Sequence, residues 1–325
     1  MKEEMSFPNP ICRKPLSGFI LLAGGILMAL SAAGLAAQTN EPPATTAPAH
    51  ASRPENLPAN PKIPSLFLIG DSTVRNGQGR GDGGQWGWGD FVAPYFDTNQ
   101  INVVNRALGG TSSRTYYRDQ WPRVAAMLKP GDFVIMQFGH NDGSALNDTT
   151  RARGTIKGVG DEAETITNLI THKIEVVHSF GWYERMIIAE TRKQGATPLV
   201  CSLIPRNNWQ NGRVARNKND YAGWAEQVAA SEETAFLDLN EIIARQYDAL
   251  GQEAVKPLFI AGAGPHTSLA GAQTNAACVV AALKGLKENP LAGFFSDKAG
   301  AVIPADLSQP APNPVMPARD KTEPE

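Results

Sequence analysis

Between residues 65 and 302, short apolar runs alternate with longer amphipathic stretches. The apolar runs resemble strands that are buried on both faces, and strands that alternate with helices favour a parallel sheet covered on both sides. We therefore predict an α/β fold with a parallel, doubly wound sheet. The expected strands are residues 65–70, 101–104, 132–138, 198–204 and 235–239. The expected helices are residues 89–96, 119–128, 172–194, 220–230, 241–250 and 270–287.

The two ends of the chain differ in composition from this alternating middle. An uncharged apolar run over residues 16–37 follows three basic residues and ends in small side chains. This pattern predicts a signal peptide over 1–37, cleaved near Ala36 or Ala37, with an uncleaved membrane anchor as the alternative. The Pro-, Ala- and Thr-rich segment 38–64 is typical of a linker, and 303–325 of a flexible tail. We expect one domain, residues 65–302, that is secreted or periplasmic, or else tethered to the membrane.

Charge and cysteine content exclude several classes of function. The chain has 30 Lys and Arg against 32 Asp and Glu, so its net charge of −2 gives no reason to expect a nucleic-acid partner. Its 3 cysteines are too few and too scattered for a disulfide framework or a closed zinc site. We expect neither redox chemistry nor a bound metal.

Residues that could take part in catalysis follow the first three expected strands, at the edge where parallel sheets bind ligands. Ser72 follows the first strand and is either a nucleophile or a helix N-cap. Gly109 follows the second, where its amide either binds an oxyanion or belongs to a tight turn. Asn141 follows the third, and its side-chain amide either donates to the same developing charge or closes a turn. Taken together, the three positions predict a catalytic site at this edge of the sheet.

His266 is the candidate general base. It lies in a loop that leads into the last expected helix, so it reaches the same edge of the sheet as Ser72. His50 falls in the linker, while His172 and His178 fall six residues apart in one expected helix without a metal-binding spacing. We interpret those two histidines as structural.

The ordered set Ser72, Gly109, Asn141 and His266 resembles the SGNH superfamily of GDSL-type esterases. The surrounding segments, such as "LFLIGDSTVRNGQG", "DFVIMQFGHND" and "HTSLAGAQTNAA", look most like the rhamnogalacturonan acetylesterase-like branch. The resemblance implies a flavodoxin-like three-layer sandwich with a five-stranded parallel sheet. It implies Ser72 as nucleophile, and an oxyanion hole made of the Ser72 and Gly109 amides and the Asn141 side chain. It further implies His266 as base and acid, with no metal or organic cofactor.

One position departs from the family pattern, which has an aspartate three residues before the histidine. This chain has Ala263 there. In a serine protease, replacing the corresponding carboxylate lowers turnover by about four decades. A Ser–His dyad is the working hypothesis, with the second ring nitrogen bonded to a backbone carbonyl of this loop or to another carboxylate such as Asp142. A non-catalytic binding protein is a further alternative.

The substrate is inferred from aromatic and polar residues near the strand ends. Tryptophan rings pack on sugar rings, and Asn or Arg side chains donate hydrogen bonds to sugar hydroxyls. Tryptophans near the start of a helix also serve as packing residues, which is the alternative for Trp86 and Trp88. The charged stretch 151–164 forms either a loop over the cleft or a solvated loop. The candidate substrate-binding residues are Trp86, Trp88, Arg206, Asn207, Asn208 and Trp209.

With the family resemblance, these residues predict a secreted esterase that removes acetyl groups from a pectic, rhamnogalacturonan-like polysaccharide. A lipase or thioesterase of the same fold is the alternative among esterases. We expect a monomer, with no nucleic-acid partner and no stable membrane insertion of the mature domain.

Overall fold

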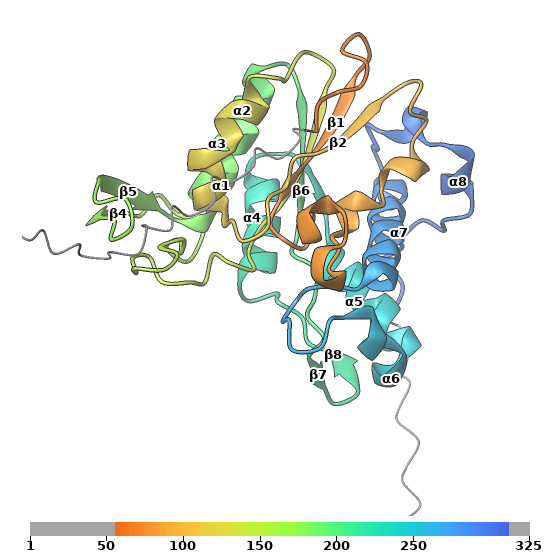
Figure 1. Cartoon of the computed structure of the whole chain (residues 1–325). Coiled ribbons are helices and arrows are strands. Elements are labelled where there is room, and N and C mark those ends of the chain that lie inside the picture. Colours follow the sequence, from red (N-terminus) through yellow and green to blue (C-terminus); the bar gives the residue numbers. More distant parts are fainter. Residues whose placement is uncertain (1–55, 312–325) are drawn as a thin grey trace, which may run out of the picture. The chain divides into compact units, whose positions relative to one another are not determined.

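The computed structural model describes residues 56–311, and the predicted parallel sheet forms its centre (Figure 1). Five parallel strands lie in the order β2-β1-β3-β6-β9, which is the flavodoxin-like order. The strands are β1 (Ser65–Gly70), β2 (Asn102–Asn105), β3 (Phe133–Gln137), β6 (Thr197–Cys201) and β9 (Ala235–Leu237). The α/β sandwich is thus confirmed, with the strands displaced by at most a few residues from their predicted bounds. The predicted signal peptide lies outside the described residues.

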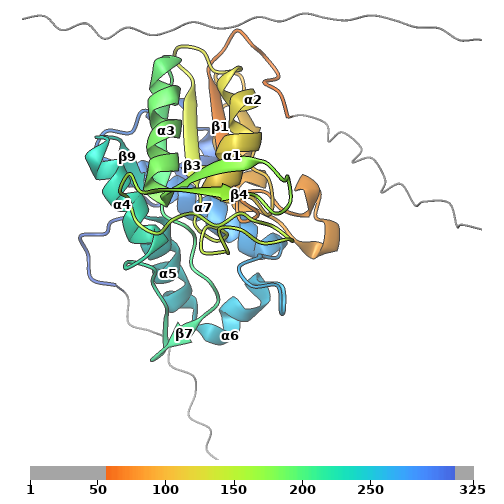
Figure 2. The ribbon, with the colours of Figure 1, turned by 90° about the vertical axis from the view of Figure 1, so that its left-hand side faces the viewer.

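Helices cover both faces of the sheet, and the two faces have separate apolar cores (Figures 1 and 2). Alternate residues of β1 enter opposite cores: Leu66 and Leu68 enter one, and Phe67 and Ile69 the other. One face carries α1 (Ser113–Asp119), α2 (Trp121–Ala125), α3 (Phe180–Lys193) and α4 (Tyr221–Ser231). The other carries α5 (Leu239–Leu250), the short helix α6 (Gln252–Val255) and α7 (Leu269–Gly285). A further short helix, α8 (Asp297–Gly300), follows them.

The register of the sheet brings the predicted site loops to one edge. Leu68 of β1 pairs with Asn105 at the end of β2, and Gly70 pairs with Gln137 at the end of β3. Gly70 has φ +151°, and a Cβ there would lie 2.4 Å from the carbonyl oxygen of Gln137. Only glycine fits this close approach, so the chain turns sharply just before Ser72.

The predicted helix over 172–194 is wrong in its first part. Residues 163–178 form an antiparallel hairpin of β4 (Ala163–Thr167) and β5 (Ile174–His178), and α3 begins only after Ser179. The hydroxyl of Ser179 accepts a hydrogen bond from the Trp182 amide at 3.1 Å, which caps the helix. His178 therefore ends a strand, where its ring stacks on Trp182 at 3.8 Å, and the β-branched residues of 174–177 explain the strand.

Two other predicted helices are also altered. Residues 89–96 form only two single 3₁₀ turns, Trp88–Asp90 and Ala93–Tyr95, because the first of them is held against the loop after β1. The predicted helix 119–128 is replaced by α1 and α2, which break at Gln120. A second small hairpin joins β7 (Trp209–Gln210) to β8 (Arg213–Val214).

The described chain remains in contact with the domain beyond both predicted boundaries. Asn60 donates its backbone amide to Oδ1 of Asn102, the first residue of β2, at 2.9 Å. At the other end, Ala305 donates to Ala281 of α7 at 2.9 Å. Within residues 56–311, no helix is long and apolar enough to cross a membrane.

Candidate active site

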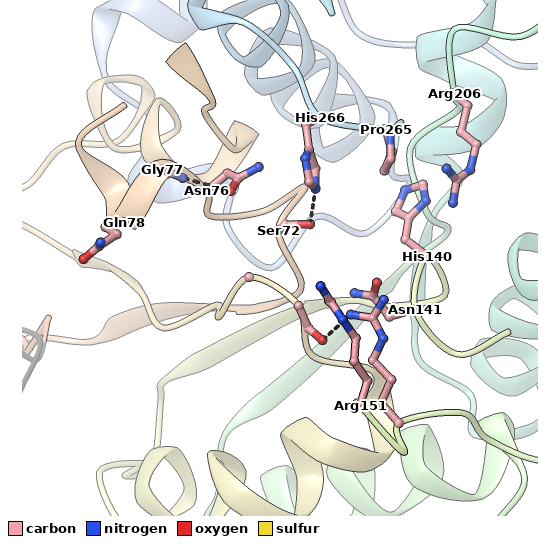
Figure 3. Close-up of a pocket in the computed structure, with 13 residues that line it drawn as sticks. Ser72, Asn76, Gly77, Gln78, His140, Asn141, Arg151, Arg206, Pro265 and His266 are labelled. Atoms are coloured by element: carbon pink, nitrogen blue, oxygen red, sulfur yellow. Dashed lines mark hydrogen bonds between the residues drawn. The ribbon is translucent and has the colours of Figure 1, made fainter. Parts of the chain in front are cut away.

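Ser72 and His266 meet at the carboxyl edge of the sheet, although they lie 194 residues apart in the sequence (Figure 3). The distance from Ser72 Oγ to His266 Nε2 is 3.0 Å, and His266 is the hydroxyl's hydrogen-bond partner among the described residues. Ser72 is therefore not an N-cap. Both side chains line a cavity of about 620 Å³. A hydroxyl with a histidine acceptor at this distance is the arrangement that activates a serine nucleophile.

The cavity also contains the hydrogen-bond donors that an oxyanion requires. Among the hydrogen bonds of the described chain, none uses the backbone N–H of Ser72 or Gly109. A Cβ on Gly109 would lie 3.5 Å from Ser72 Cβ, so the two residues are neighbours. Asn141 lines the same cavity, and its Nδ2 donates one hydrogen to Thr111 O at 2.7 Å, which leaves the second hydrogen for a ligand. The three predicted donors are thus brought together.

Asp142 does not take the place of the missing carboxylate. Its Oδ1 accepts from the backbone amide and hydroxyl of Ser113 at 3.0 and 2.5 Å, and its Oδ2 accepts from the Gly139 amide at 3.0 Å. Burial raises the pKa of Asp142 to about 7, against the lowering effect of the bonds from Ser113. This carboxyl fixes the loop that carries Asn141, and the alternative that it orients His266 is wrong.

The second nitrogen of the His266 ring has no partner among residues 56–311. No hydrogen bond or ion pair of the described chain uses Nδ1, so the alternative of a backbone carbonyl acceptor is also not realised. The His266 backbone amide donates to Ala263 O at 3.3 Å, which closes a turn with these two residues at its ends. Burial and the positive charge of Arg206 lower the pKa of His266, so the ring is neutral and able to accept a proton at pH 7.

Three arginines line the cavity, and of these the sequence analysis singled out only Arg206 as a substrate-binding residue. Arg151 and Arg153 line the cavity from the start of the stretch 151–164, while its last two residues begin β4. Only the first part of the stretch therefore borders the cleft, where Figure 3 shows Arg151. A Cβ at Gly110 would lie 3.8 Å from Nη1 of both arginines, so their guanidinium groups converge beside the Gly109 loop. In the described part of the chain, no carboxylate lies within ion-pair distance of the three, and the lining contains no acidic residue.

Both tryptophans predicted to bind sugar belong to the packing of the domain. Trp88 is 0% exposed, and its Nε1 donates to Gln137 Oε1 at 2.9 Å, so it cannot contact a sugar. Trp86 is half-buried, packs edge-on against Phe91 at 5.2 Å and does not line the cavity. For these two residues the packing alternative holds, because the chain from 86 to 89 is pressed against the loop after β1.

Asn207, Asn208 and Trp209 also lie outside the cavity lining. Asn207 Oδ1 accepts a hydrogen bond from Trp209 Nε1 at 2.7 Å, and Trp209 packs partly against the core beside α5 and α7. The sequence analysis did not single out the remaining polar side chains of the cavity, Asn76, Gln78 and His140. Burial, with smaller contributions from Arg206 and His266, lowers the pKa of His140 to about 3, so its ring is uncharged.

Known proteins are similar to this chain in sequence and in fold. Residues 68–273 match the model of the GDSL-like lipase/acylhydrolase family, which is more than half of the chain. A rhamnogalacturonan acetylesterase of Emericella nidulans is 32% identical over 197 residues, covering 60% of this chain and 75% of that protein. The Bacillus subtilis protein named "Probable rhamnogalacturonan acetylesterase YesY" is 30% identical over 229 residues, covering 69% of this chain and 92% of its own length.

A solved structure agrees at the level of the fold. The crystal structure of the Bacillus subtilis protein YxiM superposes with a TM-score of 0.55 at 24% identity, covering 68% of this chain and 56% of that protein. The family model spans the segments that carry Ser72, Gly109, Asn141 and His266. The chain therefore belongs to the GDSL-like lipase/acylhydrolase family and is a carboxylic ester hydrolase.

Proposed function

We propose that this protein is a serine acetylesterase that works through a Ser72–His266 dyad and removes acetyl groups from an acidic, pectic polysaccharide. The observation that carries the proposal is the 3.0 Å contact of Ser72 Oγ with His266 Nε2 in a cavity next to unused backbone donors. The two relatives named as rhamnogalacturonan acetylesterases support the choice of acyl group and polymer.

The mechanism follows from the positions of the donors. His266 Nε2 takes the Ser72 proton while Oγ attacks the acetyl carbonyl carbon, and the resulting oxyanion accepts from the amides of Ser72 and Gly109 and from Asn141 Nδ2. The His266 imidazolium then gives its proton to the sugar oxygen as the ester bond breaks. Water, deprotonated by His266, attacks the acetyl-serine and releases acetate, which restores the serine hydroxyl.

The lining of the cavity supports an acidic sugar polymer and a short acyl group. Arg151, Arg153 and Arg206 supply positive charge to the cavity, and none of them forms an ion pair within the described chain. Guanidinium groups bind carboxylates such as those of uronic acids. Apart from glycines, Pro265 is the single apolar residue of the lining. A long acyl chain would have no apolar surface to cover, so the cavity favours an acetylesterase over a lipase.

A catalytically weak form of the same enzyme, which mainly binds the polymer, is the second candidate. Ala263 and the lack of a partner for His266 Nδ1 among the described residues favour it, because nothing there stabilises the imidazolium. For either candidate, we propose export through the predicted signal peptide 1–37, which places the enzyme where polysaccharides occur.

Acetate release from acetylated rhamnogalacturonan and from acetylated xylan tests the proposal. We expect wild type to prefer the acidic polymer and Ser72→Ala to lower the rate by about 10³-fold or more. The Ser72→Ala protein must retain the thermal transition of wild type, since the hydroxyl makes no contact needed for the fold. Equal rates for the two proteins would reject Ser72 as nucleophile, and a slow wild type that still binds the polymer would favour the second candidate.

A further inference from the structure

Residues 86–89, which we call the bracket segment, bond to the loops of both Ser72 and His266. On one side, the Trp86 amide donates to Thr267 O at 3.0 Å, and Thr267 Oγ1 donates to Trp86 O at 2.8 Å. On the other side, the Trp88 amide donates to Thr73 O at 3.0 Å, and the Gly89 amide donates to Val74 O at 2.9 Å. The residues that directly follow the nucleophile and the base are thus fixed to one short stretch of backbone.

The bracket segment has little freedom to move. A Cβ on Gly87 would lie 2.2 Å from Val74 C and 2.3 Å from Val74 O, so the two backbones are in direct contact. The buried Trp88 ring is anchored to β3 through Gln137, whose Nε2 in turn donates to Thr73 Oγ1. The spacing between the Ser72 and His266 loops is therefore set by backbone that is itself tied to the central sheet.

We propose that the bracket segment, through Thr267, positions His266 against Ser72 and so compensates in part for the missing carboxylate at Ala263. The inference rests on the proposed Ser72–His266 dyad. In a triad the carboxylate holds the imidazole, whereas here the ring has only Ser72 as a partner in the described chain. Its orientation depends on the backbone from which it projects, and Thr267, 1% exposed, fixes that backbone. Thr267 is a positioning residue, since it acts through its neighbour.

The test compares Thr267→Val with Thr267→Ser. Valine matches the shape of threonine but loses the bond to Trp86 O, while serine keeps the hydroxyl. We expect Thr267→Val to lower kcat about ten- to hundredfold with little change in KM, because small misplacements of catalytic groups cost rates of this order. Thr267→Ser should stay within a fewfold of wild type. Equal kcat values for the Val variant and wild type would overturn the inference.

A double-mutant cycle with Ala263→Asp separates positioning from mere stability. The turn that His266 N closes onto Ala263 O places residue 263 next to the histidine, at the position where the family pattern has its aspartate. If the bracket segment orients His266, the added carboxylate reduces the kcat loss caused by Thr267→Val. The same kcat loss in both backgrounds would show that Thr267 does not position the ring. If Ala263→Asp is itself inactive, the kcat values of Thr267→Val and Thr267→Ser in the wild-type chain decide whether Thr267 positions His266.

Two controls keep the outcomes distinct. If Thr267→Val does not show a cooperative thermal transition, Gly87→Ala is measured in its place, because it displaces the bracket segment from Val74. We expect Gly87→Ala to lower kcat. An unchanged kcat for this variant would reject the inference. Ser72→Ala is measured in parallel. If wild type is no faster than Ser72→Ala, the proposed function fails; if wild type is faster and the Thr267 and Gly87 variants equal it, only the positioning inference fails.

Discussion

The catalytic wall of the cleft, which carries Ser72 and His266, is held mainly by backbone hydrogen bonds from residues 86–89, supported by the buried side chains of Thr267 and Trp88. The arginine wall, which carries Arg151 and Arg153, is held by buried polar side chains. Arg114, 0% exposed, donates to Leu146 O, Gly154 O and Glu175 Oε1 at 2.7, 2.9 and 2.8 Å. It therefore fixes both ends of residues 146–154, which carry Arg151 and Arg153, to the hairpin of β4 and β5.

The difference shows how the two walls respond to change. The backbone bonds do not depend on exposed side chains, and the side chains that support them, Thr267 and Trp88, are buried, so the spacing of the dyad tolerates surface substitutions and changes of salt. The arginine wall depends on the single buried side chain of Arg114, whose loss leaves the carbonyls of Leu146 and Gly154 without this donor. We therefore expect stability to be most sensitive at the arginine wall, and turnover to be most sensitive at the catalytic wall.

The largest expected effect on stability is at Arg114. Arg114→Met removes one of three partners of the Glu175 carboxylate, which keeps Arg118 and Asn168. It also removes the donor to the carbonyls of Leu146 and Gly154, and should lower the free energy of unfolding by about 3–5 kcal/mol. Chemical denaturation measures the change. Arg118→Met is the matched control, because Arg118 pairs with the same Glu175 from a side chain that is 38% exposed, and should cost about 1 kcal/mol or less. Equal losses for the two variants would mean that burial does not distinguish these arginines.

The next effect concerns binding at the arginine wall. Arg151→Gln removes one of two converging positive charges, and should raise KM for acetylated rhamnogalacturonan by about three- to tenfold and weaken its dependence on salt. KM for neutral acetylated xylan should change less. Arg192→Gln, which removes the same charge near the start of β6 at the opposite edge of the sheet, is the control. A parallel rise of KM for both polymers would contradict recognition of acidic sugars.

The smallest effect is expected at Glu184 of α3, outside the cavity lining. This carboxyl is 0% exposed, and neither oxygen has a hydrogen-bond partner in the described chain. Burial, and secondarily the charge of Asp142, raises its pKa well above the ordinary value of 4.5. The folded protein therefore holds a proton that the unfolded chain releases above pH 4.5, so this residue reduces stability progressively as the pH rises.

Replacing Glu184 tests this sign. Glu184→Met should raise the free energy of unfolding by about 1 kcal/mol, with a larger gain at pH 8 than at pH 5, as measured by thermal unfolding at both values. Glu184→Gln stays uncharged but polar, so it should share the pH trend with a smaller gain. A gain that is independent of pH would show that ionisation of Glu184 does not limit stability.

The sequence by itself determined the sheet and the segments that carry the chemistry. Buried parallel strands have an apolar composition that is visible locally, and residues such as Gly70 and Gly109 mark the turns that follow them. Ser72, Gly109, Asn141 and His266 were found for the same reason, because each belongs to a short motif at the end of a strand or the start of a helix. A local pattern suffices where the physical cause is local.

Only the tertiary structure decided what each polar or aromatic side chain contacts. Trp88 and Arg151 both follow glycine-bearing or charged stretches, yet the tryptophan is buried against β3 and the arginine lines the cavity. The predicted helix at His178 failed because a hairpin partner 15 residues earlier, Ala163, makes it a strand. Such outcomes depend on neighbours that are distant in sequence, as the hydrogen bond of Thr267 depends on Trp86. Which neighbours come into contact is decided only when the whole chain packs, because they compete for the same space.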